Sequence, residues 1–205
     1  MKDSTNKGYW QKIAKIYAPL MESDKKFYAD ICEKIRVYLK PDMNVLELAC
    51  GSGQLSVKLA DSVNNWIATD FSEKMIEHAK KRTVSDKLSF YVADATNLSY
   101  GDSEFDCVVI SNALHIMPEP EKAMSEICRV IKPGGVLYAP TFLWVEGKAS
   151  KTRRKMMSLT GFKTYREWDR DSFATFITEY GFKVEALHLI DGGLAPVGAL
   201  VATKE

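Results

Sequence analysis

The sequence predicts a single α/β domain built on a doubly wound, mostly parallel sheet. From residue 44 to residue 142, short apolar runs alternate with segments of helical periodicity. Strands joined in this way by helices require right-handed crossovers, which make neighbouring strands parallel. With 205 residues and 46% hydrophobic content, the chain can also bury a substantial core without metal or disulfide support.

The residues before position 42 are predicted to be helical. A short helix is expected around residues 10–17, and apolar residues at four-residue steps predict another over 27–39, before Pro41. Five buried strands then alternate with three helices, the second of which has Ser72 as its expected N-cap. The predicted strands are 44–49, 66–70, 88–94, 105–111 and 136–142, and the predicted helices are 54–63, 72–83 and 119–131.

The alternation breaks after Phe142. Residues 146–170 contain eight Lys or Arg residues against three acidic ones, and a helix is predicted over 170–180, ended by Gly181. Strands at 183–190 and 196–203 are close enough to form an antiparallel hairpin, which puts one reversed strand at the edge of a seven-stranded sheet. We therefore divide one domain, 1–205, into an N-terminal helical lid (1–40), a central core (42–142), a basic insertion (143–170) and a C-terminal helix with two strands (171–205).

Composition excludes several classes of function. With 28 basic and 27 acidic side chains the net charge is +1, so no nucleic acid partner is expected. The four cysteines are far apart and no histidines cluster near them, which predicts no metal site and favours a reducing compartment, the cytoplasm. The polar N-terminus does not resemble a secretory signal, and no apolar run is long enough for a transmembrane segment.

The best-defined motif joins a buried strand to a glycine turn and a helix. Residues 45–54 read VLELACGSGQ, and glycine lets a ligand approach the backbone at the carboxyl end of a strand. Asp70 ends the next strand, 17 residues after Gly53, where a carboxylate can accept hydrogen bonds from both hydroxyls of a ribose. Asp94 ends the third strand, where it can accept from an adenine amino group while the Ala95 amide donates to the ring. Together these features predict a site for an adenosine-containing ligand.

The same motif discriminates between adenosine-containing cofactors. A dinucleotide-binding turn has a third glycine where this chain has Ser56, and the negative charge of Glu47 disfavours a pyrophosphate. Both residues therefore disfavour a nicotinamide-dependent oxidoreductase. S-adenosylmethionine, an adenosine with a cationic amino acid tail, satisfies the pattern.

The motifs together resemble class I S-adenosylmethionine-dependent methyltransferases, in the broad group that includes the ubiquinone/menaquinone and phospholipid enzymes. Besides the glycine turn, residues 68–72 resemble the ribose-binding strand end, 90–95 the adenine-binding strand end, and 105–115 the fourth strand with its loop. Residues 126–135, which end in Lys132-Pro133-Gly134-Gly135, form the most specific match. The resemblance implies a Rossmann-like fold and methyl transfer to a small molecule by in-line displacement from the sulfonium.

The resemblance also implies a set of cofactor-binding residues. The glycine turn would line the methionine end, Asp70 would bind the ribose, and side chains after the second and third strands would contact adenine. Residues at the end of the fourth strand would face the sulfonium and the amino acid group. The set is Glu47, Gly51, Ser52, Gly53, Asp70, Phe71, Met75, Asp94, Ala95, Ser111 and Asn112. Two departures from the family pattern are Glu47, where Asp is usual, and the pair Ala49-Cys50.

The acceptor side is less defined. His115 is the candidate catalytic base and, with Tyr17, a candidate substrate contact; alternatively it packs over the cofactor or caps the turn at Pro118. The aromatic residues Tyr9, Trp10 and Tyr17 are either a lid or ordinary core. We expect the basic segment to cover the substrate, where it would meet an acidic acceptor or a lipid head group. Alternatively, it forms a solvated helix face.

The acceptor itself and the oligomeric state stay open at this stage. Strand four is not followed by an Asn/Asp-Pro-Pro-aromatic turn, so amino-group methylation of adenine or glutamine is not expected. The alternative to an enzyme is a methyltransferase-like binding module that holds the cofactor without turnover.

Overall fold

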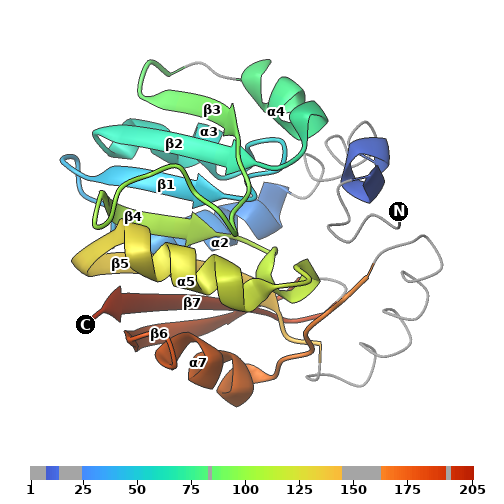
Figure 1. Ribbon diagram of the computed structural model, residues 1–205, viewed down its shortest axis with the longest axis vertical. Helices are drawn as coiled ribbons and strands as arrows, with labels where there is room; N and C mark the ends of the chain where they lie inside the picture. Colours follow the sequence, from blue (N-terminus) through green and yellow to red (C-terminus); the bar gives the residue numbers. More distant parts are fainter. Residues whose placement is uncertain (1–7, 14–24, 83–84, 145–162, 193–194) are drawn as a thin grey trace.

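The structure, a computed structural model, describes residues 8–13, 25–82, 85–144, 163–192 and 195–205. Its centre is a seven-stranded sheet in the order β3-β2-β1-β4-β5-β7-β6 (Figure 1). Strands β1 to β5 are parallel, and β7 is antiparallel to both of its neighbours. The strands are β1 Asn44–Leu48, β2 Asn65–Asp70, β3 Leu88–Val92, β4 Phe105–Ile110, β5 Ile131–Phe142, β6 Phe182–Ile190 and β7 Val197–Lys204.

Helices cover both faces of the sheet. Residues 8–13 are helical and lie beyond the carboxyl ends of the strands, beside α4 (Figure 1). Ser72 caps α4 as predicted, its hydroxyl accepting the Met75 amide at 3.4 Å. The other helices are α2 Lys25–Arg36, α3 Ser56–Leu59, α4 Glu73–Lys80, α5 Pro120–Val130 and α7 Arg170–Thr178, with 3₁₀ turns at Ala60–Ser62 and Leu114–Ile116.

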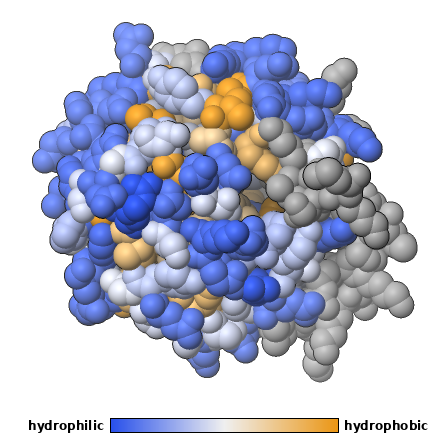
Figure 2. Space-filling view, viewed as in Figure 1, coloured by the Kyte–Doolittle hydropathy of each residue, from blue (hydrophilic) through white to orange (hydrophobic). Residues whose placement is uncertain are grey.

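Two hydrophobic cores follow from the alternation of side chains along the strands. In β1, Val45 packs with α2, α3 and α4 on one face, whereas Leu46 and Leu48 pack with α5 and α7 on the other. Because parallel strands are covered on both faces, β1 and β4 are buried at nearly every position. On the surface in Figure 2, hydrophilic residues predominate, with small hydrophobic patches between them. None of the helices in the described part of the chain combines the length and the apolar character that crossing a membrane requires.

The predicted elements are present, with different ends. The helix predicted over 54–63 is a short α3 followed by a 3₁₀ turn, and α2 ends at Arg36 instead of residue 39. Strand β5 begins at Ile131, five residues before the predicted start. Its register with β4 shifts between Phe105 and Cys107, so the Lys-Pro-Gly-Gly segment is a bulge within the strand and not a turn before it.

The C-terminal hairpin occupies the edge of the sheet, as predicted, but the reversed strand lies one place further in. Strand β7 pairs with β5 from Val136–Thr203 to Phe142–Val197, and β6 forms the outer edge. The burial of the two strands explains this order. Six consecutive residues of β7 are buried, whereas β6 carries Lys183 and Glu185 and is partly exposed.

Candidate functional site

A pocket of about 470 Å³ opens at the carboxyl ends of β1 to β4, a size typical of small-molecule sites. Open α/β sheets bind ligands at this edge because the loops after neighbouring strands meet there. The lining residues are Trp10, Ala49, Gly51, Asp70, Phe71, Met75, Ala93, Asp94, Ala95, Thr96, Ser111, Asn112, Ala113, Ile116, Met117, Pro118 and Glu119. They come from four strand ends, α4, the start of α5 and the N-terminal helix.

The Asp70 carboxylate organises the loops after β1 and β2. One of its oxygens accepts the Gly51 amide and the other accepts the Ser72 amide, both at 2.9 Å. Gly51 has φ +56°, and Ala49, two residues earlier, has φ +51°, a left-handed conformation that is uncommon for a residue with a Cβ. Each carboxylate oxygen has more than one acceptor position, so Asp70 can hold this turn and still accept from a ligand.

The loop after β3 is held by two residues of α5. Arg129 binds Glu126 through two N–H···O contacts of 2.8 Å and also donates to the Tyr100 carbonyl at 2.7 Å and the Leu98 carbonyl at 3.1 Å. Glu126 in turn accepts the Leu98 amide at 2.6 Å. Upstream in the loop, one oxygen of Asp94 accepts the amide and the hydroxyl of Thr96. The bidentate pair of Arg129 and Glu126 thus holds the loop that carries Asp94.

The end of β4 presents two polar atoms without partners. The hydroxyl oxygen of Ser111 and the side-chain oxygen of Asn112 are buried and have no hydrogen-bond partner within the described structure. Asn112 has φ +52°, and its amide donates to the Pro140 carbonyl at 2.7 Å. Buried polar atoms are nearly always paired, so these two indicate where a bound molecule supplies the missing partners.

The charge of the pocket has one sign. Its ionisable lining residues are Asp70, Asp94 and Glu119, and no Lys, Arg or His lines it within the part of the chain that the structure describes. A pocket lined in this way favours a cationic ligand over a phosphate or a pyrophosphate. Elsewhere in the described ranges, no group of three His, Cys, Asp or Glu side chains is arranged to hold a metal ion.

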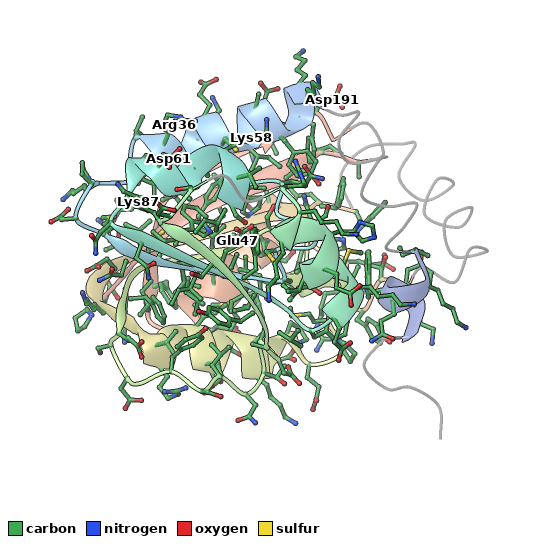
Figure 3. The ribbon with its side chains drawn as sticks, turned by 90° about the horizontal axis from the view of Figure 1, so that it is seen from above. Arg36, Glu47, Lys58, Asp61, Lys87 and Asp191 are labelled. Carbon is green, nitrogen blue, oxygen red and sulfur yellow. The ribbon has the colours of Figure 1, made fainter. Side chains whose placement is uncertain are left out.

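Three residues of the predicted set lie outside the pocket lining. Glu47 lies on the same face of β1 as Val45, and its carboxylate accepts from Ser56 and from the Trp66 indole, the latter at 2.9 Å. Figure 3 shows Glu47 inside the molecule. Burial raises the pKa of Glu47 from 4.5 to about 7.

The second half of the glycine turn packs against protein instead of lining the pocket. Gly53 has φ +77°, and a Cβ there would lie 2.9 Å from the Phe90 ring. The Ser52 hydroxyl accepts from Gln54 at 3.1 Å, and the Ser52 carbonyl accepts from Arg82 at 2.8 Å. These contacts connect the turn to β3 and α4, so Gly53 serves close packing.

His115 is also absent from the pocket lining. It is 1% exposed, its Nδ1 lies 3.0 Å from the Thr141 hydroxyl, and its ring packs against Phe142 and Trp144. Burial lowers the pKa of His115 from 6.5 to about 3, so the ring is neutral. The His115 carbonyl accepts the amides of Tyr165 and Arg166, which fastens that segment to the loop after β4.

Several residues that line the pocket are not in the set predicted from the sequence. Ala49, Ala93, Thr96 and Ala113 adjoin predicted site residues, so their strand-end positions were a usable signal. The apolar stretch from Ile116 to Pro118 gave no such signal, because apolar loop residues are equally typical of core. Tyr17 and most of the basic insertion, including residues 148–157, lie outside the described residues.

Comparison with known proteins gives the family. Residues 46–139 match the family model described as "Methyltransferase domain". The chain is 32% identical to the demethylmenaquinone methyltransferase of Renibacterium salmoninarum, over 75% of this chain and 72% of the relative. It is 31% identical to the ubiquinone/menaquinone biosynthesis C-methyltransferase of Rickettsia akari, over 77% and 76% of the two chains.

The chain belongs to the S-adenosylmethionine-dependent methyltransferase family. Another relative, the demethylmenaquinone methyltransferase of Clavibacter sepedonicus, is 45% identical over a shorter stretch, 44% of this methyltransferase and 38% of the relative. The fold agrees with that of an S-adenosylmethionine-dependent methyltransferase from Thermotoga maritima, with a TM-score of 0.77 at 19% identity over 96% of this chain and 98% of that one.

The pocket of this methyltransferase fits the cofactor that its family uses. S-adenosylmethionine carries a sulfonium and an ammonium, and the only charged groups that line the described pocket are carboxylates. The unpartnered oxygens of Ser111 and Asn112 can accept hydrogen bonds from an ammonium. Of the eleven residues predicted to bind the cofactor, the structure brings eight together around this pocket.

Proposed function

We propose that this protein transfers a methyl group from S-adenosylmethionine to a small, uncharged aromatic acceptor of the quinol type. The observation that carries the proposal is the pocket at the carboxyl edge of the sheet. Among the described residues, its charged lining groups are all carboxylates, and two buried oxygens there have no partner. The cofactor half follows from the charge of the lining, and the acceptor class follows from the relatives.

Each part of the cofactor has a complementary group. Asp70 would accept from the ribose hydroxyls while it keeps its two backbone contacts. One oxygen of Asp94 is engaged by Thr96, which leaves the other for the adenine amino group. Phe71 and Met75 would pack on the adenine ring, and Ser111 and Asn112 would accept from the ammonium.

The cofactor, when bound, supplies a methyl group already activated by its sulfonium. The protein therefore needs to bind and orient the two reactants and to exclude water. A buried His115 with a pKa of about 3 is a poor proton acceptor near neutral pH. We therefore assign His115 a supporting role in holding Tyr165 and Arg166 against the loop after β4.

The acceptor class is inferred from two relatives, which are named for demethylmenaquinone and for ubiquinone/menaquinone biosynthesis. A neutral quinol is consistent with a pocket whose described lining has no cation to pair with an anionic acceptor. The same proposal holds that the acceptor is a small molecule and not a nucleic acid. It also holds that the protein is cytoplasmic, because its four cysteines are free, as is usual in a reducing compartment.

A binding experiment tests the cofactor assignment, and a turnover experiment tests the acceptor assignment. S-adenosylhomocysteine should raise the thermal unfolding temperature of the protein, and NAD should not; the reverse result would exclude the cofactor assignment. Tritium from methyl-labelled S-adenosylmethionine should then appear in a demethylated menaquinol analogue. Cofactor binding with no transfer to any quinol analogue would favour the binding module.

The Asp70→Asn variant tests the ribose assignment. We expect a loss of S-adenosylhomocysteine affinity of about tenfold or more, because one charged acceptor becomes a donor. Asn is preferable to Ala because its single oxygen can keep one of the two contacts to the Gly51 and Ser72 amides, whereas Ala would lose both. Isothermal titration calorimetry gives the affinity, and unchanged binding would refute the assignment.

A further inference from the structure

The N-terminal helix contributes directly to the pocket. Residues 8–13 lie across the carboxyl edge of the sheet, near the start of α4 (Figure 1). Trp10 lines the pocket together with Phe71 and Met75, which follow Asp70 at the end of β2. The indole ring is half-buried, and Tyr9 packs edge-on against it with ring centroids 5.4 Å apart.

A contact distant in sequence places this helix. The Gln11 side-chain amide donates to the Glu73 carboxylate, 62 positions further along the chain. Glu73 is in the first turn of α4, directly after the Ser72 N-cap. The same turn of α4 is attached to Asp70, whose carboxylate accepts the Ser72 amide. The Gln11–Glu73 hydrogen bond therefore joins the helix that carries Trp10 to the part of the pocket that we assign to adenosine.

We propose that Trp10 is a cofactor-binding residue that packs against the bound adenosine, and that Gln11, through Glu73, is the positioning residue that holds Trp10 there. The inference rests on the proposed function, because it takes the ligand to be S-adenosylmethionine or its product. An aromatic ring over an adenine or ribose excludes water and adds stacking contacts. A rigid connection to α4 reduces the entropy lost when the ring is ordered on binding.

Intrinsic fluorescence can follow this contact. Of the four tryptophans, Trp66, Trp144 and Trp168 are 0%, 1% and 6% exposed, so Trp10 is the one that a soluble quencher reaches most easily. Saturating S-adenosylhomocysteine should reduce acrylamide quenching of the wild type, and the reduction should disappear in Trp10→Phe. Equal protection in both proteins would overturn the proposal.

Affinity measures the contribution of the ring. We expect Trp10→Ala to weaken S-adenosylhomocysteine binding by about tenfold, and Trp10→Phe to recover part of the loss. Lys12→Ala is the matched control, since Lys12 is exposed on the same helix and does not line the pocket. A Trp10→Ala variant with wild-type affinity for S-adenosylhomocysteine but a raised KM for the acceptor would assign Trp10 to the acceptor and refute the cofactor contact.

Exchanging the two partners tests the positioning role of Gln11. Gln11→Glu puts two carboxylates together and should weaken S-adenosylhomocysteine binding by about threefold. Adding Glu73→Gln restores an amide and a carboxylate in the opposite order, so the double variant should recover the affinity. If Gln11→Glu alone has no effect, or if the exchange does not rescue it, Gln11 does not position Trp10.

A failure of the inference about Trp10 and Gln11 can be distinguished from a failure of the proposed function. If the wild type does not bind S-adenosylhomocysteine, the cofactor assignment fails, whatever Trp10 does. If the wild type binds and the Trp10 and Gln11 variants bind equally well, the cofactor assignment stands and the inference about the N-terminal helix is wrong.

Discussion

Glu47 is a buried carboxylate whose ionisation opposes folding. It is 1% exposed, and burial outweighs its hydrogen bonds from Ser56 and Trp66, so its pKa rises from 4.5 to about 7. A group whose pKa is higher in the folded state stabilises the fold below its unfolded pKa and loses that contribution as the pH rises through the folded pKa. For Glu47 this loss lies between about pH 4.5 and pH 7 and amounts to roughly 3 kcal/mol.

The Glu47→Gln variant tests this linkage. We expect the free energy of unfolding of the wild type, relative to that of the variant, to fall as the pH rises from 5 to 8, because Gln does not ionise. Urea unfolding at several pH values measures the difference. The exposed Glu77→Gln substitution on α4 is the control, and a pH-independent difference between wild type and Glu47→Gln would contradict the assignment.

At the scale of elements, α5 supports the pocket from a distance. Glu126 and Arg129 lie three residues apart on this helix and together bind the loop that follows β3. The motif around Lys132-Pro133-Gly134-Gly135, so informative in the sequence, contributes no lining residue. Its role is to hold the loop after β3 and to shape the bulge at the start of β5.

Arg129→Ala should therefore affect both stability and binding. It removes contacts to two carbonyls and leaves Glu126 partly buried without its cation, which we expect to lower the free energy of unfolding by more than the loss of an exposed ion pair. S-adenosylhomocysteine affinity should fall as well, and Arg129→Lys should recover only part of either loss because Lys lacks the planar fork. The exposed Lys183–Glu185 pair provides the control: Lys183→Ala should cost no more than about 0.5 kcal/mol. Calorimetry and urea unfolding report the two quantities, and a loss no larger than the control would disprove the role of Arg129.

At the scale of the whole molecule, the last strand is central to the sheet. Strand β7 lies between β5 and β6, and the Lys204 ammonium donates to the carbonyls of Cys128 and Ile131 at 2.6 and 2.9 Å. Both cores include β7 residues, Val197, Ala199 and Val201 on one face and Leu200 and Ala202 on the other. Stability therefore depends on a strand that contributes no residue to the pocket lining.

Removal of residues 197–205 should abolish cooperative thermal unfolding, because β5 and β6 lose the strand that joins them. Circular dichroism during heating provides the measurement. Removal of Glu205 alone should leave a cooperative transition close to that of the wild type, since it deletes a single backbone contact to Gly181. A truncated protein that still melts cooperatively would show that the two cores do not need β7.

Much of the fold and of the site was predictable from local pattern. Buried strands alternating with helices require crossovers, and this determined the parallel part of the sheet and the edge at which a ligand binds. Asp70 and Asp94 were accessible to this reasoning because each ends an apolar strand. Trp10 was not, because nothing near it in the sequence distinguishes a pocket residue from a core aromatic.

The order of strands and helices along the chain, the family and the strand ends that line the pocket follow from the sequence alone, since these depend on periodicity and on residues adjacent along the chain. Only the tertiary structure decided which side chains face the pocket. Glu47 accepts hydrogen bonds from Ser56 and Trp66, Gly53 packs against Phe90, and His115 is enclosed by Phe142 and Trp144. Gln11 and Glu73 meet across 62 positions, and the side-chain direction and long-range contacts that bring them together arise only when the sheet and its helices have packed.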